Sequence, residues 1–149
     1  MDDADINFIR NHPYAGMITL RPDGRPHVAR MEAVIVDGRL CSTSGPSTVR
    51  ERNLRRDPSC TLFFPASPPD DRWVAVDTTA VVTAGPAAAP RLLALARARH
   101  GVEDDGTFLA HDDTVGHDQP FTEAAYLDYI AETGPVLIDF DVVRVYGNR

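Results

Sequence analysis

Two tight-turn sequences near the start of the chain constrain its fold more than any other feature. The first, Pro22-Asp23-Gly24, combines a proline that presets φ, an aspartate that bonds its own backbone and a glycine suited to the left-handed region. The second, Asp37-Gly38, is typical of the type I′ turn of a β-hairpin. Three consecutive antiparallel strands are therefore predicted around these turns, at residues 15–20, 27–36 and 39–44.

The remainder of the chain adds three strands and four helices. Thr48 and Glu51 have the spacing of a capping box, which predicts a helix that ends at Asp57-Pro58. The other strands are predicted at residues 59–64, 72–83 and 136–146, and the other helices at 5–11, 91–100 and 122–132. The acidic stretch 102–119 shows no periodicity and is predicted to be a loop. These elements predict a mainly β fold with α insertions, a small six-stranded antiparallel barrel in which residues 1–149 form a single domain.

Composition excludes several classes of function. The formal net charge of -7 repels a phosphodiester backbone, so no nucleic-acid partner is expected. All 15 basic residues are arginine, which excludes Schiff-base chemistry on a lysine of this chain. The motifs of P-loop, dinucleotide-binding, zinc-protease and serine-hydrolase proteins are absent. No apolar run approaches a membrane span, the acidic start has no signal-peptide order, and two cysteines fit a reducing compartment. A cytoplasmic protein with no membrane partner is expected.

Residues 42–53 carry the strongest indication of a ligand site. Ser42, Thr43 and Ser44 end a predicted strand, and Arg50 lies in the first turn of the helix that follows. Free backbone N–H groups at a helix start favour anions, and the guanidinium fork of an arginine matches phosphate oxygens. The pattern predicts a phosphate site. The alternative is a capped surface helix whose arginines are solvated.

The strand predicted at residues 27–36 carries charge where a core strand would be apolar. Arg30 and Glu32 share a face with three valines. This face is either a solvated surface with an exposed ion pair or the floor of a groove for a polar, planar ligand. The pattern alone leaves both interpretations open.

Two further groups of residues are candidates for reactive chemistry. Residues of metal-ligand types lie close together at His111-Asp112-Asp113 and His117-Asp118, but their spacing fits no known zinc or calcium motif, so no metal site is expected. The two cysteines, at 41 and 60, are interpreted as buried strand residues rather than catalytic thiols. No residue stands out as a catalytic acid or base.

Three segments, in this order, resemble the pyridoxamine 5′-phosphate oxidase-like split β-barrel proteins. They are the hairpin at residues 18–27, the segment 53–58 after a basic helix start, and the strand that begins Arg72-Trp73-Val74-Ala75-Val76. The resemblance covers residues 8–83 and resumes in the last predicted strand. It implies a Greek-key, FMN-binding type of split barrel and a homodimer. It also implies that FMN or the deazaflavin F-420 binds in grooves at the subunit interface.

The resemblance also implies a set of cofactor-binding residues. In such proteins a basic residue at the helix start and hydroxyls of the preceding strand hold the phosphate of the cofactor, while the second strand lines its isoalloxazine ring. On this chain the residues that correspond to the phosphate contacts are Ser42, Thr43, Ser44, Arg50 and Asn53. Those that correspond to the ring contacts are Arg30, Met31 and Glu32. Trp73 is either a cofactor contact or a packing aromatic.

Three departures from the family pattern bear on the predicted site. Val49 stands where many relatives carry a second basic residue, and Asp77 replaces a glycine and adds negative charge near the predicted groove. The stretch 102–119 has no counterpart, and the signature for a vitamin B6 substrate is absent.

Together these features predict an oxidoreductase that moves a hydride between F-420 or FMN and an organic small molecule. Arg52 and Arg56 share one face of the helix at 48–57, where they would meet the carboxylate tail of F-420, which favours F-420 over FMN. The alternative is a non-catalytic flavin- or haem-binding or storage protein of the same fold. Turnover of the bound cofactor with a second substrate distinguishes the two. A dimeric barrel whose groove has lost its ligand is a third interpretation.

Overall fold

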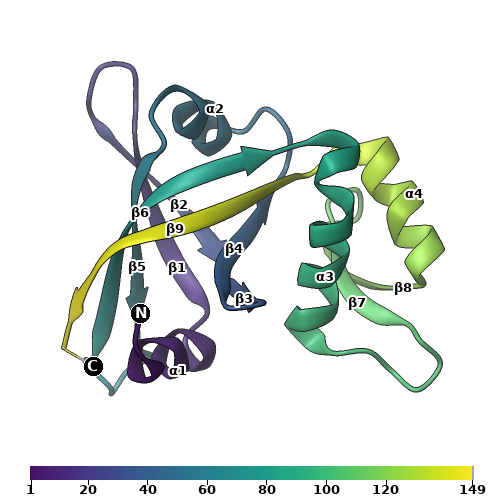
Figure 1. Ribbon diagram of the computed structural model, residues 1–149, viewed down its shortest axis with the longest axis horizontal. Coiled ribbons are helices and arrows are strands. Elements are labelled where there is room, and N and C mark those ends of the chain that lie inside the picture. Colours follow the sequence, from purple (N-terminus) through teal and green to yellow (C-terminus); the bar gives the residue numbers. More distant parts are fainter. Residues whose placement is uncertain (149) are drawn as a thin grey trace.

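The computed structural model describes residues 1–148 and shows a curled antiparallel sheet with a smaller lobe beside it (Figure 1). The sheet has seven strands in the order β2-β1-β5-β6-β9-β4-β3, and it curls into a half-barrel. The strands are β1 Tyr14–Leu20, β2 Pro26–Glu32, β3 Val34–Val36, β4 Arg39–Ser44, β5 Ser59–Pro65, β6 Trp73–Thr83 and β9 Val136–Gly147. The long strands β6 and β9 run from the half-barrel to the lobe (Figure 1).

Both tight turns predicted from the sequence are confirmed. Gly24 has a φ of 80°, and the backbone N–H of Arg25 donates to Asp23 Oδ1 at 3.0 Å, so the first turn joins β1 to β2. Asp37 and Gly38 have φ values of 51° and 74°, as a type I′ turn requires, and they join β3 to β4.

The first two helices of the chain are held at their starts by side-chain caps. α1 (Asp3–Asn11) has a complete capping box between Asp2 and Asp5. α2 (Val49–Arg56) is capped by Thr48, whose hydroxyl accepts from the Glu51 N–H at 3.3 Å. The Glu51 carboxylate reaches back to the N–H of Ser47 rather than to that of Thr48, so the predicted box is displaced by one residue.

The predicted six strands are seven because the segment 27–36 does not form one strand. The backbone N–H of Ala33 donates to Pro13 O at 2.8 Å, which takes this residue out of the sheet between β2 and β3. β2 then pairs with β1 and β3 pairs with β4, at opposite edges of the sheet. The hydroxyl of Ser42 donates to Glu32 O at 2.8 Å and links the two regions across the curl.

The prediction of a loop at residues 102–119 is wrong for the second half of that stretch. Phe108–Asp112 and His117–Phe121 form a separate two-stranded hairpin, β7 and β8. The hairpin packs beside α3 (Ala89–His100) and α4 (Glu123–Thr133), and we call residues 89–133 the side lobe. Only Phe108 and Ala110 of β7 are buried, so the apolar pattern is too short to stand out among the acidic residues around it.

Two hydrophobic cores meet across strands β4 and β9. Leu40 and Ile138 belong to the core of the half-barrel, whereas their neighbours Cys41 and Leu137 belong to the core of the side lobe. This follows from the alternation of side chains along a strand. The two strands therefore fix the side lobe against the half-barrel. No helix within residues 1–148 is long and apolar enough to cross a membrane.

Both cysteines are buried, and their chemistry gives a first testable prediction. Burial raises the pKa of Cys41 to about 11 and also raises the pKa of Cys60. Because the thiolate is the reactive form, neither thiol is expected to react with a thiol reagent at about pH 8 while the protein is folded. A colorimetric thiol assay should detect both only after unfolding. Rapid reaction of either thiol in the native protein would contradict this prediction.

Candidate active site

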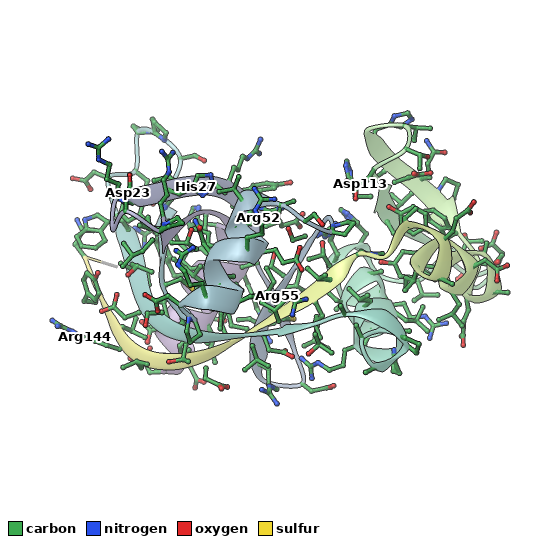
Figure 2. The ribbon with its side chains drawn as sticks, turned by 90° about the horizontal axis from the view of Figure 1, so that it is seen from above. Asp23, His27, Arg52, Arg55, Asp113 and Arg144 are labelled. Carbon is green, nitrogen blue, oxygen red and sulfur yellow. The ribbon has the colours of Figure 1, made fainter. Side chains whose placement is uncertain are left out.

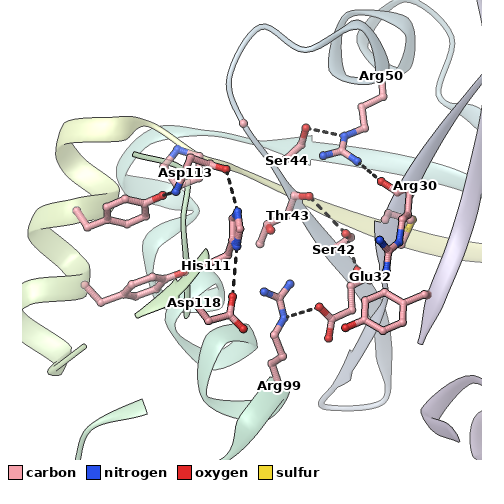
Figure 3. Close-up of a pocket in the computed structure, with 16 residues that line it drawn as sticks. Arg30, Glu32, Ser42, Thr43, Ser44, Arg50, Arg99, His111, Asp113 and Asp118 are labelled. Atoms are coloured by element: carbon pink, nitrogen blue, oxygen red, sulfur yellow. Dashed lines mark hydrogen bonds and ion pairs between the residues drawn. The ribbon is translucent and has the colours of Figure 1, made fainter. Parts of the chain in front are cut away.

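A cavity of about 500 Å³ lies between the half-barrel and the side lobe (Figure 3). Its half-barrel side is lined by Tyr14, Arg30, Met31, Glu32, Ser42, Thr43, Ser44, Gly45 and Arg50. The other side consists of Pro135 and the lobe residues Arg99, His111, Asp113, Asp118, Tyr126 and Tyr129. Seven of the nine residues proposed from the sequence, namely Arg30, Met31, Glu32, Ser42, Thr43, Ser44 and Arg50, thus line one cavity.

Arg50 occupies one corner of this cavity, at the first turn of α2. Its Nε donates to Ser44 Oγ at 2.8 Å, and one terminal nitrogen donates to Arg30 O at 2.9 Å. These bonds use two of the five guanidinium N–H groups. Ser44 Oγ also lies 2.9 Å from Thr48 Oγ1, so the end of β4 and the start of α2 are joined through hydroxyls.

The charge of Arg50 is shaped by its surroundings. Burial lowers the pKa of Arg50, and the carboxylate of Asp113 acts in the opposite direction. Asp113 lies on the side of the lobe that faces α2 (Figure 2). A Cβ added at Gly45 would lie 3.9 Å from Asp113 Oδ2, so this carboxylate comes close to the chain between β4 and α2. A partly desolvated cation that faces hydroxyls is a suitable partner for an anion.

An ion pair lines another part of the cavity. Glu32 at the end of β2 lies 3.2 Å from Nε of Arg99 on α3, and both side chains are largely buried. The guanidinium of Arg30 lies 4.7 Å from the ring centre of Tyr14. Arg30 and Glu32 both line the cavity. That a polar, planar ligand lies along this strand stays a prediction.

Two residues proposed from the sequence are not brought to the cavity. Asn53 is buried under α2, where its amide nitrogen donates to Thr19 Oγ1 at 3.0 Å. Trp73 packs beside Phe63 and Tyr146 at the far end of β6, with ring centres 5.7 and 6.1 Å away. Asn53 holds α2 on β1, and Trp73 is a packing aromatic.

The arginines proposed to meet a cofactor tail also lie elsewhere. Arg52 donates to Ser47 O at 2.5 Å, and Arg56 donates to Leu20 O and to Asn53 Oδ1. Arg55, which lies between them on the same helix, pairs with Glu51 at 2.9 Å. None of the three lines the cavity, and Figure 2 shows Arg52 and Arg55 on α2. The arginines that do line it are Arg30, Arg50 and Arg99.

Two of the departures noted in the sequence, Asp77 and Val49, do not reach the cavity, whereas the stretch 102–119 contributes His111, Asp113 and Asp118 to its wall. Asp77 accepts a hydrogen bond from Thr61 Oγ1 at 2.8 Å and lies 3.4 Å from the hydroxyl of Tyr146. Its charge is therefore not part of the cavity lining. Val49 is exposed at the start of α2 and is likewise not a lining residue.

Sequence reasoning missed the wall formed by the side lobe. His111 and Asp118 face each other across the β7–β8 hairpin, with His111 Nδ1 3.2 Å from Asp118 Oδ1. Tyr129 accepts the Asp113 N–H at 3.1 Å, and burial raises the pKa of Tyr126 to about 12. The alternation of Phe108, Ala110 and the polar residues between them was the available signal. Within residues 1–148 no group of three His, Cys, Asp or Glu side chains is arranged to hold a metal ion.

Several solved structures of other proteins align with this chain over most of its length. The chain aligns with a conserved hypothetical protein of Mycobacterium tuberculosis with a TM-score of 0.70 and 20% identity, over 99% of this chain and 84% of the other. An F-420 reductase aligns with a TM-score of 0.59 and 18% identity, over 94% of each chain. A haem-binding protein from Mycobacterium smegmatis aligns with a TM-score of 0.64 and 16% identity, over 95% of this chain and 50% of the other.

At these identities the structural likeness shows the fold alone. No curated protein sequence matches the chain. The family model of pyridoxamine 5′-phosphate oxidase matches residues 1–145, nearly the whole chain, in agreement with the split-barrel resemblance of its sequence. The chain therefore belongs to the pyridoxamine 5′-phosphate oxidase family.

Proposed function

We propose that the protein is an oxidoreductase that uses a flavin-type cofactor, FMN or F-420, to transfer a hydride to or from an organic small molecule. The observation that carries this proposal is the corner of the cavity where Arg50 meets Ser44 at the start of α2. Hydroxyls, a helix start and a partly desolvated guanidinium together fit a phosphate group. The family includes oxidoreductases, and one structural neighbour is an F-420 reductase.

Different residues of the cavity would bind different parts of the cofactor. Arg50, Ser44 and Thr43 would hold the phosphate, and Arg30, Met31 and Glu32 on β2 would lie along the ring system. The bound cofactor supplies the hydride chemistry, while the chain supplies orientation and charge. The bond from Arg50 to Arg30 O fixes the phosphate corner relative to β2.

The experiment that tests this proposal is a paired titration. The absorbance spectrum of the purified protein is recorded first, and FMN and F-420 are then added separately while cofactor fluorescence is followed. We expect saturable binding of one of the two. The Arg52→Ala variant should bind it equally well, because Arg52 bonds to Ser47 O outside the cavity. The proposal fails if neither cofactor binds.

One observation favours a second candidate function, a haem-binding protein without turnover. His111 lines the cavity, and its Nε2 has Asp113 Oδ1 at 3.7 Å, beyond hydrogen-bond distance. A neutral imidazole nitrogen is a common axial ligand of haem. Titration with haemin should then give a Soret band that shifts in the His111→Ala variant. Reduction and reoxidation of a bound flavin-type cofactor by a second substrate would favour the enzyme instead.

A homodimer is a further expectation of this proposal. Strand β2 forms one edge of the sheet, and Val28 on it is 65% exposed. Val143 on β9 is 71% exposed, so apolar surface lies on the outer side of the sheet as well. A second copy would cover such an edge through an isologous contact. Sedimentation at micromolar concentration should give twice the chain mass of 16.3 kDa, and a monomer would contradict the expectation.

A further inference from the structure

We propose that His111, oriented by Asp118, is the catalytic residue that transfers the proton accompanying hydride transfer in this cavity. The inference rests on the proposed function, because it assigns a residue to the same reaction. It concerns the β7–β8 hairpin of the side lobe. Figure 3 shows His111 on the lobe side of the cavity, opposite Thr43 and Ser44 on the half-barrel side.

The hairpin fixes the geometry of the pair. His111 and Asp118 are partners in the antiparallel register, so their side chains lie on the same face. His111 Nδ1 lies 3.2 Å from Asp118 Oδ1. The neighbouring Phe108 and Ala110 are buried in the lobe core, which anchors β7 and leaves His111 on the face toward the cavity.

Both oxygens of Asp118 are engaged. Oδ2 lies 3.3 Å from Nε2 of His100 on α3, and Oδ1 faces His111. A carboxylate held in this way gives the Nδ1 position of His111 the proton and leaves Nε2 for exchange with a bound molecule. It also balances the charge of the ring while the ring holds a second proton. Asp118 is therefore a positioning residue.

Several other lining residues are poor proton donors at neutral pH. The arginines at 30, 50 and 99 do not release their protons. Burial raises the pKa of Tyr126 to about 12. Glu32 is paired with Arg99. Histidine is the side chain that exchanges protons most readily in this range.

The proposed step balances in atoms and charge. A bound, reduced flavin-type cofactor would supply a hydride to one carbon of an activated double bond, and the doubly protonated ring of His111 would give its Nε2 proton to the adjacent carbon. The substrate gains two electrons and two hydrogens, the cofactor is oxidised, and the ring is left neutral. Solvent then returns the proton to Nε2, since the side chain is 45% exposed.

The test separates the two half-reactions with two probes. Cyclohexenone needs both a hydride and a proton at carbon, whereas N-benzyl dihydronicotinamide delivers a hydride to the oxidised cofactor and releases no proton. General acid catalysis contributes about 100- to 10,000-fold. We therefore expect His111→Ala to slow cyclohexenone reduction at least about 100-fold. Cofactor affinity and reduction by the dihydronicotinamide should stay unchanged, and added imidazole should restore part of the lost rate.

His117→Ala is the matched control. It removes a histidine from the same hairpin that bonds to Val115 O and Gln119 and does not line the cavity. Its rates should equal those of the wild type with both probes. Asp118→Asn should slow only the cyclohexenone half-reaction, and less than His111→Ala does. Thermal denaturation of each variant reports whether the fold is intact.

The outcomes distinguish this inference from the proposed function. If neither cofactor binds to the wild type, both the proposed function and the proton-transfer role of His111 are contradicted. If the cofactor binds but the wild type does not reduce cyclohexenone, or His111→Ala reduces it at the wild-type rate, the proton-transfer role is overturned and the cofactor site stands. Equal slowing of both half-reactions in His111→Ala would also overturn it, because that result indicates a structural role.

Discussion

Replacing Arg50 by alanine should weaken cofactor binding by about 10- to 150-fold. This corresponds to about 1.5–3 kcal/mol, the contribution of a hydrogen bond to a charged group. The effect is expected to be large because Arg50 is the cation at the start of α2, partly buried and directed at the cavity by Ser44 and Arg30 O. Titration of wild type and variant with the cofactor that binds would measure it.

Two variants make the Arg50 result specific. Arg52→Ala removes a cation from the same helix but outside the cavity, so affinity should be unchanged. Arg50→Lys keeps a charge but cannot bond Ser44 and Arg30 O together, so its affinity should fall between the other two. The free energy of unfolding of Arg50→Ala without cofactor should fall by about 1 kcal/mol, since those two bonds link α2 to β4 and β2. Unaltered cofactor affinity in this variant would place the phosphate elsewhere.

Replacing Phe108 by alanine should lower the free energy of unfolding by about 3–5 kcal/mol, the range for deletion of a buried phenylalanine. Phe108 is 1% exposed, and its ring meets Tyr126 edge-on with centres 5.4 Å apart. The loss is expected because this side chain anchors β7 in the core of the side lobe. Chemical denaturation followed by circular dichroism would measure the change.

Leu109→Ala is the internal control for this stability prediction. Leu109 is the next residue of β7, lies on the opposite face and is 39% exposed. Its replacement should cost less than about 1 kcal/mol, because little apolar area is removed from the core. Similar losses in both variants would contradict the alternation of β7. A small loss in Phe108→Ala would mean that the hairpin is not an integral part of the folded protein.

The local features of the fold were readable from the sequence because they depend on neighbouring residues. The positive φ values of Gly24, Asp37 and Gly38 follow from the residues themselves, and they set two of the strand connections. The cap at Thr48 likewise depends on groups three residues apart. The same segment placed Arg50 at a helix start, so the phosphate corner could be proposed before any contact was known.

Contacts between distant segments determined the features of the fold and of the site that the sequence did not predict. The break at Ala33 depends on a bond to Pro13 O, and Arg50 is held by Arg30 O, which lies 20 residues away in the chain. Asn53 and Trp73 carry plausible side chains, yet packing turned them toward Thr19 and Tyr146. A one-dimensional pattern cannot supply such directions, because it records periodicity along an element but not the element that packs against it.

The sequence by itself therefore determined the turns, the helix starts, the sheet-rich fold and the segment that carries Arg50. Only the tertiary structure decided that residues 89–133 form a lobe and that His111 and Asp118 on it face the half-barrel across a cavity. The physical reason is that burial of apolar side chains from distant segments forms this wall of the cavity. Phe108, Ala110 and Tyr126 pack with Cys41 and Leu137 of distant strands, and the polar residues between them are carried to the cavity as a consequence.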